Sequence, residues 1–412
     1  MSRRATRDAR RHIEVSPPYA SGVAGERILC CVDESTGSLA AVRGLRTAGY
    51  EPWVAVSRPY AFAVRSRAAE GVVRVSPPKE DPATYASELA REALRLEADV
   101  VFPCTEPTMR ALTGRAMLFE RSVVGVCSPD RLDRATDKAL FGRICVEAGL
   151  DIPPTVEVDG DSLNGLDQNL PAVLKPIRSV DLGDNGSLLT GGARRIVDLE
   201  DLKRELVRKP DRKFLLQPYL DGTLAAICGV AWKGKLVCAC HQLSPRIWPP
   251  GCGNSSFAFT VERDEGREAG VARVLELLDW SGIFGLQFIL ANGRAYAIDL
   301  NPRIYGSAAL AIAAGHNLPA IWVDLLLGRS PRVGPYRSDV RYRYEVADLR
   351  ALARQLLRGG DRAAVLRGFL PRRRTVHAVF SLRDPLPMLE NVRRIAPAVT
   401  NWARRNQLEA KP

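Results

Sequence analysis

The sequence lacks several features that mark membrane, zinc-binding or nucleophilic proteins. No apolar run among its 412 residues approaches the roughly 18 that a membrane-spanning helix needs. Its nine cysteines are scattered without Cys-x-x-Cys pairs, so we expect buried free thiols in a reducing cytosol. Four histidines offer little from which to build a Ser-His-Asp or Cys-His arrangement. We therefore expect a cytoplasmic protein with no membrane contact.

The net charge of the chain raises the question of a nucleic-acid partner. The formal charge is +12, but much of it comes from arginines near the two ends of the chain. Aromatic residues do not interleave with basic ones, and no zinc-finger or helix-turn-helix pattern is present. Attraction to anionic substrates, or an arginine-rich proteome, explains the excess more simply. A nucleic-acid partner is therefore not expected, and the alternative of a basic nucleic-acid binder predicts salt-sensitive affinity.

The N-terminal region after residue 25 alternates short apolar runs with helical patterns. This alternation predicts a small parallel α/β domain. Ligands of such sheets gather at the carboxyl ends of the strands, where Asp33-Glu34 and Thr105-Glu106 fall, although each pair is as easily explained as loop polarity. No Gly-x-Gly-x-x-G follows the first strand, which disfavours dinucleotide binding there. The expected strands are 27–32, 52–56, 71–75 and 98–103, and the expected helices are 38–48 and 81–96.

Two lysines stand in unusual local contexts. A helix is predicted over residues 136–150, with Thr136 as its N-cap. Lys138 falls in its first turn, where a cation opposes the helix dipole and hints at a bound anion, although a solvated lysine is an adequate explanation. Lys175 interrupts the apolar strand 171–176, and a flexible glycine-containing stretch follows at 179–192.

A predicted hairpin carries isolated polar residues in apolar strands. Two apolar runs flank Asn292-Gly293, a pairing typical of a β-hairpin. Gln287 interrupts the first run and Asp299 the second, and a buried carboxylate costs several kcal/mol unless it is paired or metal-bound. Asp299 and Asn301 share one face of an extended strand. Oxygen ligands from these three residues suit Mg²⁺, so we predict a magnesium–nucleotide site; an ordinary hairpin with a solvent-facing aspartate is the alternative.

The metal hypothesis makes a demand on the hairpin register. Opposed residues share a face, and their numbers add to a constant that the turn fixes. Gln287 opposite Asp299 gives 586, which requires a loop of three or five residues centred on Gly293. A two-residue turn gives 585 and places Gln287 opposite Ile298. We therefore predict a turn longer than Asn-Gly alone.

The order of these features resembles the ATP-grasp superfamily of carboxylate–amine (or carboxylate–thiol) ligases. Asp137-Lys138 opens a helix, Lys175 lies in a strand before the glycine-containing stretch, and Gln217-Pro-Tyr precedes the hairpin that ends in Asp299-x-Asn-Pro-Arg303. The stretch LQFILANGRAYAIDLNPRIYGSAALA looks particularly like the synthetase domains of carbamoyl phosphate synthetase. The resemblance implies an α/β protein with an ATP-grasp fold, α+β in its ligase core, and an N-terminal parallel α/β (pre-ATP-grasp) domain.

The expected organisation then has four parts. They are a disordered basic arm (1–25), the pre-ATP-grasp domain (26–125), the ATP-grasp domain (126–330, with a lid subdomain at about 150–222) and a C-terminal appendage (331–412).

The resemblance also implies a set of site residues. Two lysines would contact the ATP phosphates, a linker would hold adenine, three residues would bind Mg²⁺ (or Mn²⁺), and two arginines would contact the transferred phosphate. The metal-binding aspartate replaces the usual glutamate, a compact Gly-Gly-x-Gly loop is missing, and Asp221 is only the nearest candidate for the ribose. In that order the residues are Lys138 and Lys175; Gln217, Pro218, Tyr219, Leu220 and Asp221; Gln287, Asp299 and Asn301; Arg303 and Arg246, with His241 a weaker phosphate contact.

The implied reaction needs charge neutralisation and positioning rather than a protein nucleophile. A carboxylate attacks the γ-phosphate of ATP, and an amine then attacks the acyl-phosphate. The expected partners are ATP, a small carboxylic acid and an amine such as an amino acid or peptide, with a homodimer possible because such ligases are often dimers. An ATP-dependent phosphotransferase on the same fold and a non-catalytic ATP-binding or regulatory protein are the alternatives.

Overall fold

The N-terminal part of the chain forms a five-stranded parallel sheet in the order β3-β2-β1-β4-β5. The computed structural model describes residues 25–159, 170–183, 186–208, 212–357, 362–370 and 374–392, so the basic arm lies almost wholly outside the described residues. Parallel sheets need cover on both faces. In β1, Ile28 and Cys30 pack against α1, whereas Leu29 and Cys31 pack against α2. The elements are β1 (Arg27–Cys31), α1 (Thr36–Thr47), β2 (Glu51–Val56), η1 (Phe62–Arg65), β3 (Gly71–Arg74), α2 (Pro82–Arg95), β4 (Val100–Pro103), α3 (Glu106–Leu112), η2 (Ala116–Leu118) and β5 (Val123–Val124).

Two helices, rather than one, lie around the helix predicted over residues 136–150. α4 (Pro129–Thr136) and α5 (Lys138–Glu147) are separated by Asp137, whose Oδ1 accepts a hydrogen bond of 2.9 Å from the Leu140 N–H. Thr136 was therefore wrongly predicted as the N-cap, because Pro129 starts a helix earlier and Asp137 caps the next one. Lys138 does lie in the first turn of α5.

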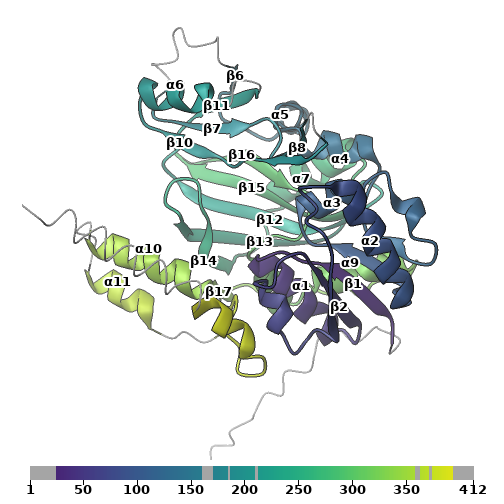
Figure 1. Ribbon diagram of the computed structural model, residues 1–412. Coiled ribbons are helices and arrows are strands. Elements are labelled where there is room, and N and C mark those ends of the chain that lie inside the picture. The colour runs from purple at the N-terminus through teal and green to yellow at the C-terminus, as the bar shows by residue number, and fades with distance from the viewer. Residues whose placement is uncertain are drawn as a thin grey trace, which may run out of the picture.

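A small antiparallel sheet, in the order β10-β7-β11-β6, lies above the rest of the chain (Figure 1). α6 packs on it, and Leu202 and Leu206 join a core that contains only residues of this region. The stretch 179–192, predicted as flexible, contains the hairpin β8–β9. We call residues 156–218 the lid sheet region. Its elements are β6 (Val156–Val158), β7 (Ala172–Pro176), β8 (Val180–Leu182), β9 (Leu188–Thr190), β10 (Arg194–Ile196), α6 (Leu199–Val207) and β11 (Phe214–Pro218).

The largest sheet has seven strands in the order β16-β15-β12-β13-β14-β17-β18, and all pairs except β17–β18 are antiparallel. Side chains of β12 alternate between two cores, as the period of a strand requires. Cys228 joins the core with α1, α8 and α9, and Ile227 joins the core with α5 and α7. The elements are β12 (Thr223–Trp232), β13 (Lys235–Trp248), β14 (Asn254–Thr260), α7 (Glu265–Leu277), β15 (Gly282–Ala291), β16 (Arg294–Asn301), α8 (Ala308–Ala314), α9 (Leu318–Leu326), β17 (Arg341–Arg343), α10 (Glu345–Leu357), α11 (Arg362–Phe369) and β18 (Thr375–His377).

β13 is six residues longer than the strand predicted at 235–242. The Pro- and Gly-rich segment 246–256 was expected to be a loop, but β13 reaches Trp248 and β14 starts at Asn254. Pro245 is accommodated because the pairing of β13 with β14 is irregular between Leu243 and Arg246.

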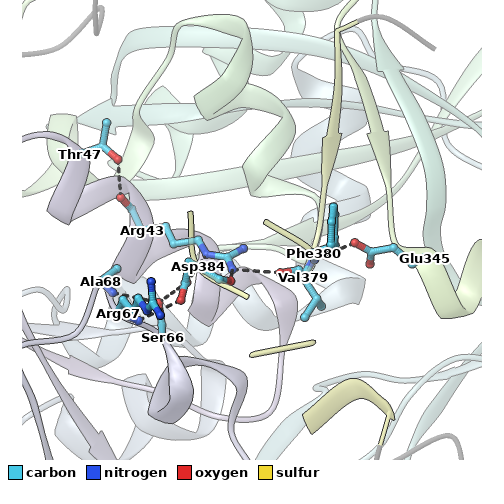
Figure 2. Close-up of polar contacts among 9 residues, drawn as sticks. All are labelled: Arg43, Thr47, Ser66, Arg67, Ala68, Glu345, Val379, Phe380 and Asp384. Atoms are coloured by element: carbon cyan, nitrogen blue, oxygen red, sulfur yellow. Dashed lines mark hydrogen bonds and ion pairs between the residues drawn. The ribbon is translucent and has the colours of Figure 1, made fainter. Parts of the chain in front are cut away.

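The segment after residue 330 contributes to the same large sheet through β17 and β18, so the proposed boundary falls inside one sheet. Beyond β18 the chain reaches the N-terminal domain, where Asp384 accepts hydrogen bonds from the Arg43 Nε at 2.9 Å and the Ser66 Oγ at 2.6 Å (Figure 2). The backbone N–H of Phe380 donates to Glu345 of α10 at 2.8 Å. This segment therefore links the large sheet to the N-terminal domain.

Within the described ranges, no single helix has the length and apolar character to cross a membrane; α8 and α9 meet that test only as a pair bent by 87°.

Candidate active site

The hairpin of β15 and β16 has the predicted register but not the predicted turn. Gln287 pairs with Asp299, as the metal hypothesis required. The prediction of a longer loop was wrong, because Asn292 and Gly293 alone form the turn, with φ of +51° and +74°. Two positive φ values are what the type I′ hairpin turn needs. A β-bulge reconciles the two findings: Phe288 pairs with Ala297, so Ile298 is an extra residue in β16.

Lys175 of the lid sheet region is hydrogen-bonded to the backbone of this bulge. Its Nζ donates a hydrogen bond of 3.0 Å to the carbonyl oxygen of Ile298. The lysine is only 6% exposed. Burial lowers the pKa of Lys175 to about 8, while the charge of Asp299 raises it and that of Lys138 lowers it. A lysine able to neutralise a phosphate therefore stands at the junction of the two sheets.

Between the lid sheet region and the large sheet lies a cavity of about 400 Å³, which we call the central cavity. Ten of the twelve predicted site residues line it, whereas the exposed Asp221 and the partly buried Arg246 do not. The ten are Lys138, Lys175, Gln217, Pro218, Tyr219, Leu220, Gln287, Asp299, Asn301 and Arg303.

Lys138 enters the central cavity from the start of α5. Its Nζ donates to the Oγ of Ser179 at 2.9 Å and lies 3.4 Å from the Oδ1 of Asp299. Ser179 precedes the β8–β9 hairpin, so Lys138 touches both walls of the cavity. The lysine predicted to bind a phosphate is thus adjacent to the carboxylate predicted to bind a metal.

The three predicted metal ligands fit a magnesium ion that is shared with a nucleotide. Asp299 Oδ1 is buried and accepts no hydrogen bond from the described residues, and Lys138 is at ion-pair distance only. Gln287 and Asn301 offer neutral amide oxygens beside it. In the described part of the chain, no three His, Cys, Asp or Glu side chains cluster to hold a metal. Mg²⁺ is commonly held by one or two carboxylates plus substrate phosphates, which this set would complete.

The predicted linker 217–220, which begins in the last two residues of β11, lies against the apolar part of the central cavity. Gln217 Nε2 donates to the Thr155 Oγ1 at 2.9 Å, and the Arg195 guanidinium lies over the Tyr219 ring, 4.2 Å from its centroid. These contacts fix the linker side chains in place. The apolar lining that a flat base would meet comes from Val173, Leu224, Ile289 and Leu300.

Arg303 and Arg246, which the resemblance paired, occupy different environments. Arg303 lines the central cavity and donates to the Ile304 carbonyl at 2.9 Å. Arg246 forms a two-pronged ion pair with the buried Asp348 and lies over the Phe257 ring, with 4.1 Å between guanidinium carbon and centroid. The structure therefore places Arg246 outside the cavity. His241 is also absent from the lining and bonds Glu268 at 2.8 Å.

Glu106 is a lining residue that the sequence did not assign to this site. It follows β4, at the carboxyl edge of the parallel sheet where ligands were expected to gather. Burial raises its pKa, although the charges of Lys138 and Arg303 lower it. The strand-end rule was the available indication, but nothing local connected this edge with a hairpin nearly 200 residues later.

With this geometry established, similarity to known proteins gives the class of the fold. Residues 210–349 match the family model described as "ATP-grasp in the biosynthetic pathway with Ter operon". The structure is similar to an L-amino acid ligase from Bacillus licheniformis (TM-score 0.55, 16% identity, 73% of this chain and 74% of that one). It is also similar to the biotin carboxylase domain of Hydrogenobacter thermophilus 2-oxoglutarate carboxylase (TM-score 0.56, 15% identity, 76% and 73%), solved with MgADP and bicarbonate. The chain has the ATP-grasp fold.

The sequence similarity to a known protein covers less of the chain than the structural similarity does. The chain is 24% identical over 220 residues to the C-terminal section of the carbamoyl phosphate synthase large chain from Aquifex aeolicus. That match covers 50% of this chain and 39% of the relative, so the chain spans well under half of it. Together these findings confirm the predicted resemblance to the ATP-grasp superfamily.

Proposed function

We propose that this protein is an ATP-dependent carboxylate–amine ligase that forms an amide or peptide-like bond and releases ADP and phosphate. One observation carries the proposal: a single cavity unites cationic residues from the lid sheet region, α5 and the end of β16 with the Gln287–Asp299 pair. The similarity to an L-amino acid ligase supports the choice of reaction. The substrates are a small carboxylic acid and an amine.

The site residues divide between holding the nucleotide and stabilising charge. Lys138 and Lys175 bind the phosphates, and the linker 217–220 holds the base. Gln287, Asp299 and Asn301 would hold a magnesium ion, which when bound would supply positive charge to the phosphate oxygens. Arg303 offers a fixed fork of donors to the transferred phosphate.

The proposed reaction has two steps. In both, the protein positions the reactants and excludes water from them. A carboxylate oxygen attacks the γ-phosphorus, the bond to the bridging oxygen breaks, and ADP leaves. The amine nitrogen then attacks the acyl carbon, and the C–O bond breaks to release phosphate. The residues at the two ends of the hairpin β8–β9 and the loop 251–253 line the central cavity and would exclude water from the acyl-phosphate.

A coupled ADP-release assay over pairs of carboxylic acids and amines tests the proposal. A ligase needs both substrates, a phosphotransferase needs one acceptor, and a binding protein releases no ADP with any pair. Asp299→Ala should abolish ADP formation because it removes the only carboxylate of the metal set. Asp130→Ala, in an exposed position outside the cavity, is the matched control. Full turnover by Asp299→Ala would contradict the metal assignment.

A further inference from the structure

Glu106, which lines the central cavity, has no role in the two proposed reaction steps. It is the first residue of α3, directly after Thr105, and its side chain is only 8% exposed. The hydroxyl of Thr105 accepts from the Thr108 N–H at 3.3 Å, and the Thr108 hydroxyl accepts from the Thr105 N–H at 3.1 Å. This reciprocal cap fixes the backbone from which Glu106 projects.

The carboxylate of Glu106 lacks a partner of its own. Its Oε1 is buried and makes no hydrogen bond, and no cation lies within ion-pair distance of it, among the residues that the structure describes. A buried carboxylate in that state costs several kcal/mol unless something binds it. Since the side chain lines the cavity, a ligand that donates hydrogen bonds or carries positive charge would satisfy it.

A second cavity shows from which side such a ligand would come. A space of about 260 Å³ lies at the carboxyl ends of β1, β2 and β4, and both neighbours of Glu106 in sequence, Thr105 and Pro107, line it. We call it the strand-end cavity. Glu106 therefore stands between the proposed nucleotide site and a separate space large enough for the body of a small molecule.

The contacts of the lid region enclose this junction. The Leu188 N–H at the start of β9 donates to the Lys79 carbonyl at 2.7 Å, and Lys79 lines the strand-end cavity. α3 also contacts β8, as their positions in Figure 1 show. A molecule in the strand-end cavity would be covered on the side where the hairpin meets the N-terminal domain.

We propose that Glu106 binds the amino group of the amine substrate, whose remaining part occupies the strand-end cavity. The inference rests on the proposed ligase function. The amine enters as an ammonium group and gives one proton to the Glu106 carboxylate. Its nitrogen lone pair then forms the C–N bond, and the bond between the acyl carbon and the phosphate oxygen breaks. Phosphate leaves with that electron pair and takes up the second proton that the nitrogen loses as the amide forms.

An amine explains the surroundings of Glu106 better than a second metal ion. The charges of Lys138 and Arg303 act on this carboxylate, as does that of Asp299. A divalent cation would keep its full charge beside the two cationic side chains, whereas an amine loses its charge as it is deprotonated. Burial raises the pKa of Glu106 and so favours the protonated carboxyl once the transfer has occurred.

The experiment separates acyl-phosphate formation from attack by the amine. Hydroxylamine is largely uncharged at neutral pH and traps an acyl-phosphate without needing a proton acceptor. Wild type and Glu106→Gln are compared with the carboxylic acid that gives the most ADP, using hydroxylamine, ammonium, methylamine or glycine as nucleophile. We expect ADP release with the three charged amines to fall about 100-fold, within the range for a positioned proton acceptor, while hydroxamate formation stays near the wild-type rate.

Controls distinguish the failure of this inference from failure of the proposed function. Glu120→Gln, at an exposed position in the same domain, should match wild type with every nucleophile. Binding of MgADP by Glu106→Gln reports that the variant is folded. A parallel loss of hydroxamate and amide, which a metal or phosphate role predicts, overturns the inference, and so does unchanged amide formation. Wild type that releases no ADP with any acid and nucleophile overturns the ligase function itself and the amine role with it.

Discussion

The ammonium group of Lys175 donates a hydrogen bond of 3.0 Å to the backbone carbonyl of Ile298, and this contact joins the lid sheet region to the large sheet. The acceptor is the extra residue of the bulge in β16. One irregularity in a hairpin therefore keeps Gln287 opposite Asp299 and also gives the buried lysine its backbone partner. The nucleotide predictions follow from this arrangement.

Lys175→Met should weaken ATP binding about 10- to 100-fold, because a hydrogen bond to a charged group contributes about 1.5–3 kcal/mol. Titration with a fluorescent ATP analogue measures the change. Lys203→Met is the control, since Lys203 is half-exposed and only pairs with the exposed Glu200. Equal affinity of wild type and Lys175→Met would remove Lys175 from the phosphate site.

ATP affinity should fall as pH rises above about 8. The pKa of Lys175 is lowered to about 8, so the free protein holds this lysine charged below that pH and neutral above it. Phosphates bind the charged form, and its pKa in the complex must therefore be higher. Linkage then predicts a loss of up to about tenfold per pH unit above 8 until the pKa of the complex is reached. Lys175→Met should flatten this part of the profile; a profile that the substitution leaves unchanged would assign the titration elsewhere.

Magnesium should bind weakly to the protein alone and much more tightly with nucleotide. The metal set contains one carboxylate and two neutral amides, and Lys138 lies 3.4 Å from that carboxylate. Phosphate oxygens must supply the remaining negative ligands. Calorimetric titration with Mg²⁺, in the absence and presence of ADP, tests this dependence. Strong binding of Mg²⁺ without nucleotide would indicate ligands outside the predicted set.

Asp384→Ala should destabilise the protein by about 2–3 kcal/mol, because it removes the carboxylate that accepts from the Arg43 Nε and the Ser66 hydroxyl, while Arg43 keeps only its hydrogen bonds to backbone carbonyls among the described residues. Figure 2 shows both groups directed at this carboxylate. Urea unfolding measures the loss. Glu276→Ala removes an exposed partner of Arg273 and should change stability by less than about 1 kcal/mol. Comparable losses in the two variants would mean that the Asp384 contacts contribute little.

The sequence predicted the site more fully than it predicted the connections that shape it. Asn292-Gly293 and the polar residues Gln287 and Asp299 carry local patterns, and the hairpin and the pairing of its polar residues were predicted correctly, whereas the longer loop was wrong. The loop length was wrong because the bulge at Ile298 went unseen, and no residue preference marks that bulge. The position of Arg246 outside the central cavity was not predicted, because its partner Asp348 lies 102 residues away and the irregular pairing of β13 removes the alternation that would orient its side chain.

The separate hydrophobic cores have a mechanical consequence. One core runs without interruption from Ile28 in the N-terminal sheet to Val340 beside the large sheet, so these parts resist motion relative to one another. The core of the lid sheet region shares no residue with it. Hydrogen bonds link this region to the rest of the described chain, among them those of Lys175 with Ile298, Lys138 with Ser179, and the Leu188 N–H with Lys79. Opening the cavity to admit a nucleotide would exchange those polar contacts for water rather than expose a packed interior, which is a hinge motion of low energetic cost.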